Sequence, residues 1–161
     1  MKVKFYIAFL LVTSFIVITA FQLEEECDAT ALKAELKREL RPDYRYDSSK
    51  STRFTYKEKK QVKEIEIPVF IGEKYRFLFH TGGLSKNIEV KIYNKSITNS
   101  KRKLLYELVP KEDQFIYVFE PEKSRKMYIE YTIPESKETT PMSSCMIFVL
   151  GYQISVLKAL D

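Results

Sequence analysis

The stretch Ser143-Ser-Cys-Met-Ile-Phe-Val-Leu-Gly-Tyr152 lies near the end of the chain and is apolar at almost every position. Successive side chains of a β-strand point to opposite faces, so a strand that is apolar at both phases must be covered on both sides. We therefore expect a central strand here, with one face in a core and the other face under a second element. That second element has to come from elsewhere in the sequence.

The sequence before this stretch contains short segments in which apolar and polar residues alternate, and polar turns separate them. Alternation of this kind is typical of half-buried strands. Eight strands without a helix between them predict an all-β fold, an antiparallel β-sandwich with jelly-roll-like topology. Pro68 suggests an edge strand or a bulge, and Ser48–Thr52 and Pro134–Ser144 are predicted loops. The expected strands are Thr52–Tyr56, Glu64–Ile71, Tyr75–His80, Asn87–Tyr93, Lys103–Leu108, Gln114–Glu120, Lys126–Ile133 and Ser144–Gln153.

A single helical pattern precedes the strands, in the sequence EEECDATALKAELKREL from Glu24 to Leu40. Asp28 or Thr30 is suited to cap it, and Pro42 should end it. A narrow apolar stripe is flanked by lysines and glutamates, so the helix is either a membrane-surface or partner-binding element or one packed on its own domain. We favour packing, because the glutamates dilute the basic face that membrane binding requires. The stripe is Leu32, Leu36 and Leu40.

The two cysteines, Cys27 and Cys145, lie at the start of this helix and in the last strand. The acidic run Glu24–Glu26 before Cys27 argues against a lipidation site. Two independent buried thiols are the alternative to a bridge. In an exported chain the single possible pairing favours a disulfide, which would stabilise a loop of this length by roughly 4 to 5 kcal/mol. We expect this bridge to hold the helix on the second face of the last strand.

The N-terminus has the features of a secretory signal peptide, since two lysines precede an apolar run that ends at Ala20. The run is shorter than the roughly 20 residues of a membrane-spanning helix, which disfavours an uncleaved anchor. We therefore expect a signal peptide over 1–20, a helical segment over 21–42 and a β-sandwich domain over 43–161. The mature protein would be periplasmic or secreted, without a membrane span.

Charge argues against nucleic acid as a partner. Removal of the predicted signal peptide lowers the formal net charge from +5 to +3, a modest excess, and export makes such a partner implausible.

The residues usually required for catalysis are sparse. His80 is the single histidine, and its place before a Thr-Gly-Gly turn predicts a structural role. Paired carboxylates such as Glu64 and Glu66 fall on the polar phase of a strand, where a solvated face is the simpler interpretation. The sequence shows no zinc or calcium spacing and no phosphate-binding glycine loop. We expect no catalytic residues, no metal site, no cofactor and no enzymatic activity.

Aromatic residues are the one compositional excess, with 11 Tyr, 11 Phe and no Trp. Exposed tyrosines could form a platform for sugars or peptides, although tyrosines also fill the core and rim of a sandwich. The absence of Trp weakens the carbohydrate interpretation. The candidate platform residues are Tyr93, Tyr106, Tyr117 and Tyr128.

The run KQVKEIEIPVFIGEKYRFLF, from Lys60 to Phe79, resembles exported bacterial β-sandwich proteins without an assigned function. The later segments NIEVKIYN, FIYVFEP and SRKMYIEY continue the likeness, and their order also resembles pre-peptidase C-terminal and carbohydrate-module-like domains. The resemblance covers roughly 62–152, implies a jelly-roll-like fold and an accessory role, and brings no catalytic residues with it.

Two functions remain open from the sequence. The favoured one is a non-catalytic structural or protein-interaction accessory of the cell envelope. The alternative is a glycan- or peptide-binding module that uses exposed tyrosines. The partner would be an envelope protein or a glycan.

Overall fold

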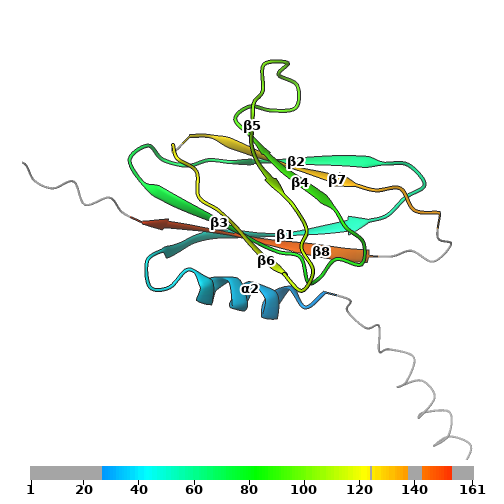
Figure 1. Ribbon diagram of the computed structural model, residues 1–161, viewed down its shortest axis with the longest axis horizontal. Coiled ribbons are helices and arrows are strands. Elements are labelled where there is room, and N and C mark those ends of the chain that lie inside the picture. The colour runs from blue at the N-terminus through cyan, green and yellow to red at the C-terminus, as the bar shows by residue number, and fades with distance from the viewer. Residues whose placement is uncertain (1–26, 124, 138–142, 154–161) are drawn as a thin grey trace, which may run out of the picture.

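The computed structural model describes residues 27–123, 125–137 and 143–153. Within these ranges the chain forms one α-helix and eight β-strands, arranged as two stacked sheets with the helix beneath one of them (Figure 1). The elements are α2 (Ala29–Glu39), β1 (Arg45–Thr55), β2 (Gln61–Ile67), β3 (Lys74–His80), β4 (Glu89–Tyr93), β5 (Leu104–Leu108), β6 (Ile116–Phe119), β7 (Met127–Ile133) and β8 (Ser143–Gln153).

Each sheet has four strands, and all strand pairs are antiparallel. Sheet A has the order β1-β8-β3-β6, and sheet B has the order β2-β7-β4-β5. Strand β8 is central in sheet A, as its apolar sequence predicts, and β2 with its following Pro68 is an edge strand. The predicted all-β antiparallel class is confirmed.

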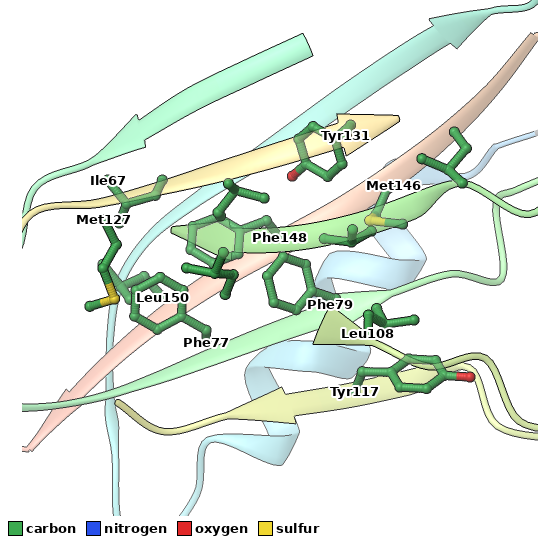
Figure 2. Packing of buried hydrophobic residues seen from close by; sticks show 14 of the residues in the cluster. Ile67, Phe77, Phe79, Leu108, Tyr117, Met127, Tyr131, Met146, Phe148 and Leu150 are labelled. Carbon is green, nitrogen blue, oxygen red and sulfur yellow. The ribbon is translucent and has the colours of Figure 1, made fainter. Parts of the chain in front are cut away.

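The inner faces of the two sheets form the main hydrophobic core. Figure 2 shows Phe77, Phe79 and Phe148 of sheet A packed together, with Tyr131 of sheet B nearby. The ring centroids of Phe79 and Phe148 are 5.4 Å apart, and the two residues are partners in the β3–β8 register. Phe54 of β1 adds an edge-to-face contact with Tyr131. The alternation of β3 and β8 thus sends every second side chain into this core.

The outer face of sheet A holds a second, smaller core beneath α2. Asp28 caps the helix, because its carboxylate accepts hydrogen bonds from the backbone N–H groups of Thr30 and Ala31. Leu36 is fully buried and Leu40 almost so, and Leu32 packs against the same cluster. The predicted packing of the apolar stripe is confirmed. The strand residues of this cluster are Leu78, Cys145, Ile147 and Val149.

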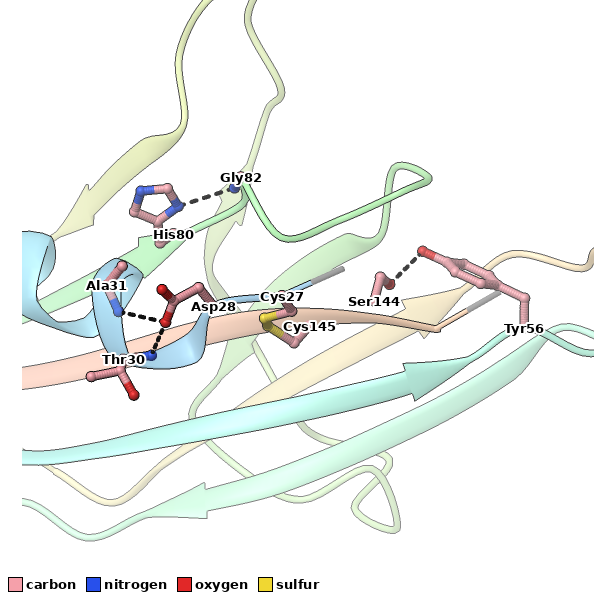
Figure 3. The surroundings of a disulfide bond; sticks show 9 residues. All are labelled: Cys27, Asp28, Thr30, Ala31, Tyr56, His80, Gly82, Ser144 and Cys145. Carbon is pink, nitrogen blue, oxygen red and sulfur yellow. Dashed lines mark hydrogen bonds between the residues drawn. A yellow bond between two sulfur atoms is a disulfide. The ribbon is translucent and has the colours of Figure 1, made fainter. Parts of the chain in front are cut away.

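A disulfide joins Cys27 to Cys145 with their Cα atoms 5.9 Å apart, so the predicted bridge between helix and last strand is present (Figure 3). Gly83 lies against it, and a Cβ there would come within 3.0 Å of both sulfur atoms. The backbone N–H of Cys145 donates to the carbonyl oxygen of Gly83. Gly151, further along β8, leaves the space that the side chain of Leu40 occupies. Two glycines therefore allow the close approach of chain segments around α2.

Six of the predicted strands agree with the structure to within two residues at each end, and the first two strands differ by more. The predicted loop Ser48–Thr52 belongs to β1, which starts seven residues earlier than predicted and pairs with β8 along its whole length. The second strand starts at Gln61 and ends at Ile67, because Pro68 cannot donate to the ladder. Phe70 and Ile71 consequently lie in the following turn, with 75% and 91% of their surface exposed.

The predicted signal peptide lies outside the described residues, as do residues 138–142 of the loop before β8. In the part of the chain that the structure describes, no helix is long and apolar enough to cross a membrane.

Candidate functional site

The helix covers only part of the outer face of sheet A. It lies over β8 and β3, and an open groove of about 490 Å³ remains between the helix and β1. We call this hollow the α2–β1 groove. Its lining residues are Ala29, Thr30, Lys33, Ala34 and Lys37 of α2, Ser49 and Ser51 of β1, and Ile147 of β8.

The helix presents opposite charges on its two sides. Lys33 and Lys37, four residues apart, form the basic wall of the α2–β1 groove. Glu35 points the other way, toward β3, where its carboxylate lies 3.2 Å from the ring of His80. An α-helix places residues i and i+4 on one side, so this segregation follows from the sequence once the leucine stripe has fixed the orientation of the helix. The groove is therefore cationic.

Tyr46 lies next to the groove, on the same face of β1. The ammonium nitrogen of Lys37 lies 3.9 Å from the centroid of the Tyr46 ring, which is within the range of a cation–π contact. The Tyr46 hydroxyl and the Ser49 hydroxyl are hydrogen-bonded at 2.9 Å. These contacts hold a tyrosine, a lysine and a serine together, so the groove offers ammonium, hydroxyl and aromatic groups above an apolar floor at Ile147.

The backbone of β1 adds a second feature, because β1 is an edge strand. The Arg53 carbonyl accepts a hydrogen bond from the Lys63 ammonium, and the Thr55 carbonyl accepts one from the Gln61 side chain. These carbonyls thus point away from β8. Along a strand, the backbone N–H and C=O groups of successive residues point to opposite edges. Ser49 and Ser51 therefore direct theirs to the same open edge as Arg53 and Thr55. Among the described residues, β8 is the one strand that pairs with β1.

His80 lies on the far side of α2 from the groove and is buried. Its Nδ1 accepts a hydrogen bond from the backbone N–H of Gly82 (Figure 3). Its Nε2 lies 3.2 Å from a carboxylate oxygen of Glu35. Both ring nitrogens are therefore engaged in holding the turn after β3 and the helix. The ring supports the turn as the sequence suggested, and it also contacts α2.

The four candidate platform tyrosines are divided between the two faces of the sheets. Tyr93 and Tyr128 are register partners on the outer face of sheet B, both half-buried. Tyr106 stacks on Phe119 with ring centroids 4.9 Å apart, at the margin of the main core. Tyr117 is buried, and its hydroxyl is bonded to the backbone of the β5–β6 loop. Tyr93 and Tyr128 thus lie side by side on an outer face, whereas Tyr106 and Tyr117 pack at the main core.

The guanidinium of Arg102 covers the ring of Tyr93, with its carbon 3.9 Å from the ring centroid. Tyr128 lies beside Glu66, which forms an ion pair with Lys126 at 2.8 Å. The hydrogen bond from Lys126 lowers the pKa of the Glu66 carboxyl. The pKa of the Tyr128 hydroxyl is raised, mainly by desolvation.

Glu64, the other carboxylate of the predicted pair, binds the loop after β4. Glu64 accepts hydrogen bonds from the Ser96 hydroxyl and from the backbone N–H of Ile97. Glu64 and Glu66 thus act separately, one in fixing a loop and one in a surface ion pair.

In the described ranges, no three His, Cys, Asp or Glu side chains come close enough to hold a metal ion.

The lysines that flank the leucine stripe are evident in the sequence, whereas Ser49 and Ser51 are not. Those serines lie in the segment predicted as a loop, and no apolar alternation marks them as strand residues. The buried phase of β1, which includes Thr52 and Phe54, becomes apparent only in the folded structure.

No protein-family model matches the chain, and no curated protein matches its sequence significantly. The fold and the groove define the class by themselves: an antiparallel β-sandwich with a disulfide-anchored helix and a basic groove beside an open sheet edge.

Proposed function

We propose that the protein is a non-catalytic, exported β-sandwich that acts as a protein-interaction accessory of the cell envelope, and that the α2–β1 groove is its contact surface. The observation that supports this most is the groove itself. Lys33 and Lys37 extend from a helix that is fixed to the sheet, above hydroxyl groups of an edge strand. Such a surface offers charge, hydrogen bonds and backbone pairing without a reacting group.

The rigidity of the groove supports a binding role. The disulfide at Cys27 fixes the start of α2, and buried Leu36 and Leu40 fix its remaining turns. A surface that is already ordered loses less conformational entropy when a partner binds. The anchored helix therefore makes the groove a preorganised site.

His80 supports the non-catalytic part of the proposal. A general base needs a free nitrogen within reach of a substrate, whereas the two ring nitrogens of His80 face Gly82 and Glu35. We expect His80→Ala to leave partner binding unchanged while it lowers stability. Loss of biological function in a folded His80→Ala protein would contradict the proposal.

Export and topology complete the proposal. We infer cleavage after Ala20 with no lipid on Cys27, which the intact mass of the exported protein tests directly. The strand orders β1-β8-β3-β6 and β2-β7-β4-β5 support a jelly-roll arrangement of two Greek keys. This topology agrees with the resemblance to exported accessory sandwiches.

A site-specific photo-crosslinker tests the groove in cells. Placed at Lys37, it should join the protein to one discrete envelope protein. Placed at Lys101, which is exposed on the loop over sheet B, it should not. A Lys33→Glu substitution should abolish the first crosslink. Equal crosslinking from both positions, or none from position 37, would contradict the proposal.

A glycan- or peptide-binding role through tyrosines is the second candidate, and the pairing of Tyr93 with Tyr128 is the observation that favours it. Glycan-array binding that Tyr128→Ala abolishes, and that the groove lysines do not influence, would favour this function over the first.

A further inference from the structure

The chemistry of the α2–β1 groove restricts what can occupy it. Lys33 and Lys37 carry positive charge, and the hydroxyls of Ser49 and Ser51 line the opposite wall. Among the described residues no carboxylate lines the groove. An occupant with negative groups therefore matches the site in charge.

The edge of β1 restricts the occupant further, to a chain with its own peptide groups. Ser49 and Ser51 direct backbone N–H and C=O groups toward the open edge, because they lie an even number of residues before Arg53 and Thr55, whose carbonyls point away from β8. An extended peptide satisfies such groups by adding as a strand. A sugar, a phosphate or a lipid headgroup has no repeating peptide groups with which to do so.

We propose that the partner segment that binds here is an extended, acidic peptide, which pairs with β1 along Ser49 and Ser51 and places carboxylates beside Lys33 and Lys37. This inference rests on the proposed function and names the chemistry of the partner.

A second copy of the chain fits the same edge poorly. Its β1 carries Arg45, Lys50 and Arg53 against the single acid Asp47. Two such strands side by side would bring like charges together, with the helix lysines of each copy adding to the repulsion. Charge therefore favours an acidic partner over self-pairing.

Fluorescence anisotropy with labelled synthetic peptides tests the inference on the mature, disulfide-bonded protein. A peptide of four Glu-Val repeats should bind, and added salt should weaken the binding, since the charges are exposed. Four Lys-Val repeats should fail because of charge. Four Glu-Val repeats that are N-methylated at every backbone nitrogen keep the charge but have no N–H groups, so they should also fail if strand pairing is required.

Two pairs of variants separate pairing from charge. Ser51→Pro removes an N–H that points to the open edge and leaves the β1–β8 ladder intact, whereas Ser51→Ala removes the hydroxyl alone. We expect the proline to abolish binding and the alanine to change the dissociation constant less than about threefold. Lys33→Glu with Lys37→Glu should weaken binding by about tenfold or more. Lys95→Glu with Lys101→Glu, the same charge change on the loop over sheet B, should alter it less than about threefold.

Several results would overturn the inference. One is unchanged affinity in a folded Ser51→Pro protein, and another is equal binding of the Glu-Val peptide and its N-methylated form. Self-association that Ser51→Pro abolishes would show a second copy at the edge. Peptide binding that appears only after deletion of residues 21–26 would show that the acidic segment of the chain itself is the occupant. If the crosslink at Lys37 persists while no acidic peptide binds, this inference fails and the proposed function stands; loss of both removes the proposed function as well.

Discussion

The two outer faces of the sandwich are covered by different kinds of interaction. On sheet A, the apolar side chains of Leu78, Ile147 and Val149 lie beneath α2, and the helix is held by Leu36 and the disulfide. On sheet B, the corresponding face is charged, and the loop between β4 and β5 is held over it by hydrogen bonds and ion pairs.

The charged face of sheet B follows from strand register. Glu64 of β2, Glu130 of β7, Lys91 of β4 and Glu107 of β5 are successive register partners across the sheet. Glu130 is buried and receives the guanidinium of Arg102 at 2.6 Å. Glu64 and Glu130 therefore anchor a loop, whereas Glu107 forms an ion pair with Lys91 within the sheet.

The sequence pattern of a strand indicates whether another element must pack over the outer face of its sheet. A strand that is apolar at both phases, as β8 is, requires an apolar element over it, and burial of apolar surface then contributes most of the stability. A strand that alternates Glu and Ile, as β2 does, requires none. Ion pairs on such a face stabilise less, because desolvation offsets much of the attraction. We therefore expect sheet A to be the more sensitive face.

The largest effect should come from the disulfide. Replacing Cys27 and Cys145 together by serine opens a loop with a sequence separation of 118 and should lower the free energy of unfolding by about 4 kcal/mol. Urea denaturation measures this loss. Reduction of the native protein should give a similar value, and complete thiol labelling of the folded, untreated protein would show that the bridge is not formed.

Leu36→Ala should have the next largest effect. The side chain is fully buried between helix and sheet, so its truncation should cost about 3 kcal/mol. Lys37→Ala, at the next position of the same helix but exposed, should change stability by no more than about 0.5 kcal/mol. Similar melting temperatures for the two variants would mean that the helix does not depend on this apolar contact.

Arg102→Ala tests the other face. The substitution leaves the Glu130 carboxylate buried without its guanidinium partner and should cost about 2 kcal/mol. The double variant with Glu130→Gln should recover part of the loss, because a neutral amide is cheaper to bury than a charge. Lys101→Ala serves as the exposed control in the same loop. A loss larger than that of Leu36→Ala would reverse the ranking of the two faces.

The smallest effect should come from a polar group inside the main core. The hydroxyls of Tyr131 and Thr52 lie near each other in the interior, yet neither makes a hydrogen bond of normal geometry. Burial also raises the pKa of the Tyr131 hydroxyl, which stays neutral. Tyr131→Phe removes a polar atom that gains little in the folded state, so stability should change by no more than about 1 kcal/mol in either direction. A larger loss in calorimetry would reveal a hydrogen bond there.

The sequence by itself determined the fold class, the helix, the cysteine pair and the position of the last strand. These features have local causes. Asp28 caps the helix through backbone groups two and three residues away, and alternation in β3 and β7 separates core from surface without reference to other strands. Because β8 is apolar on both faces, its outer face also required an element packed over it, and the cysteine pair indicated that this element is the helix.

Tertiary structure decided the extent of β1 and the places of the tyrosines. Residues 48–52 carry no apolar alternation and become a strand because β8 supplies their hydrogen-bond partners. Tyr93 and Tyr117 look alike in sequence, but the sheet and phase on which each falls makes one half-buried and the other buried.

The groove shows the same division. The spacing of Lys33 and Lys37 predicts the basic side of α2, since residues four apart share a side of any helix. That this side faces an edge strand is decided by long-range packing. The disulfide and the leucine stripe set the helix over β8 and β3, and strand order alone places β1 at the edge beside it. Strand order depends on pairing between distant segments, which local sequence patterns do not specify.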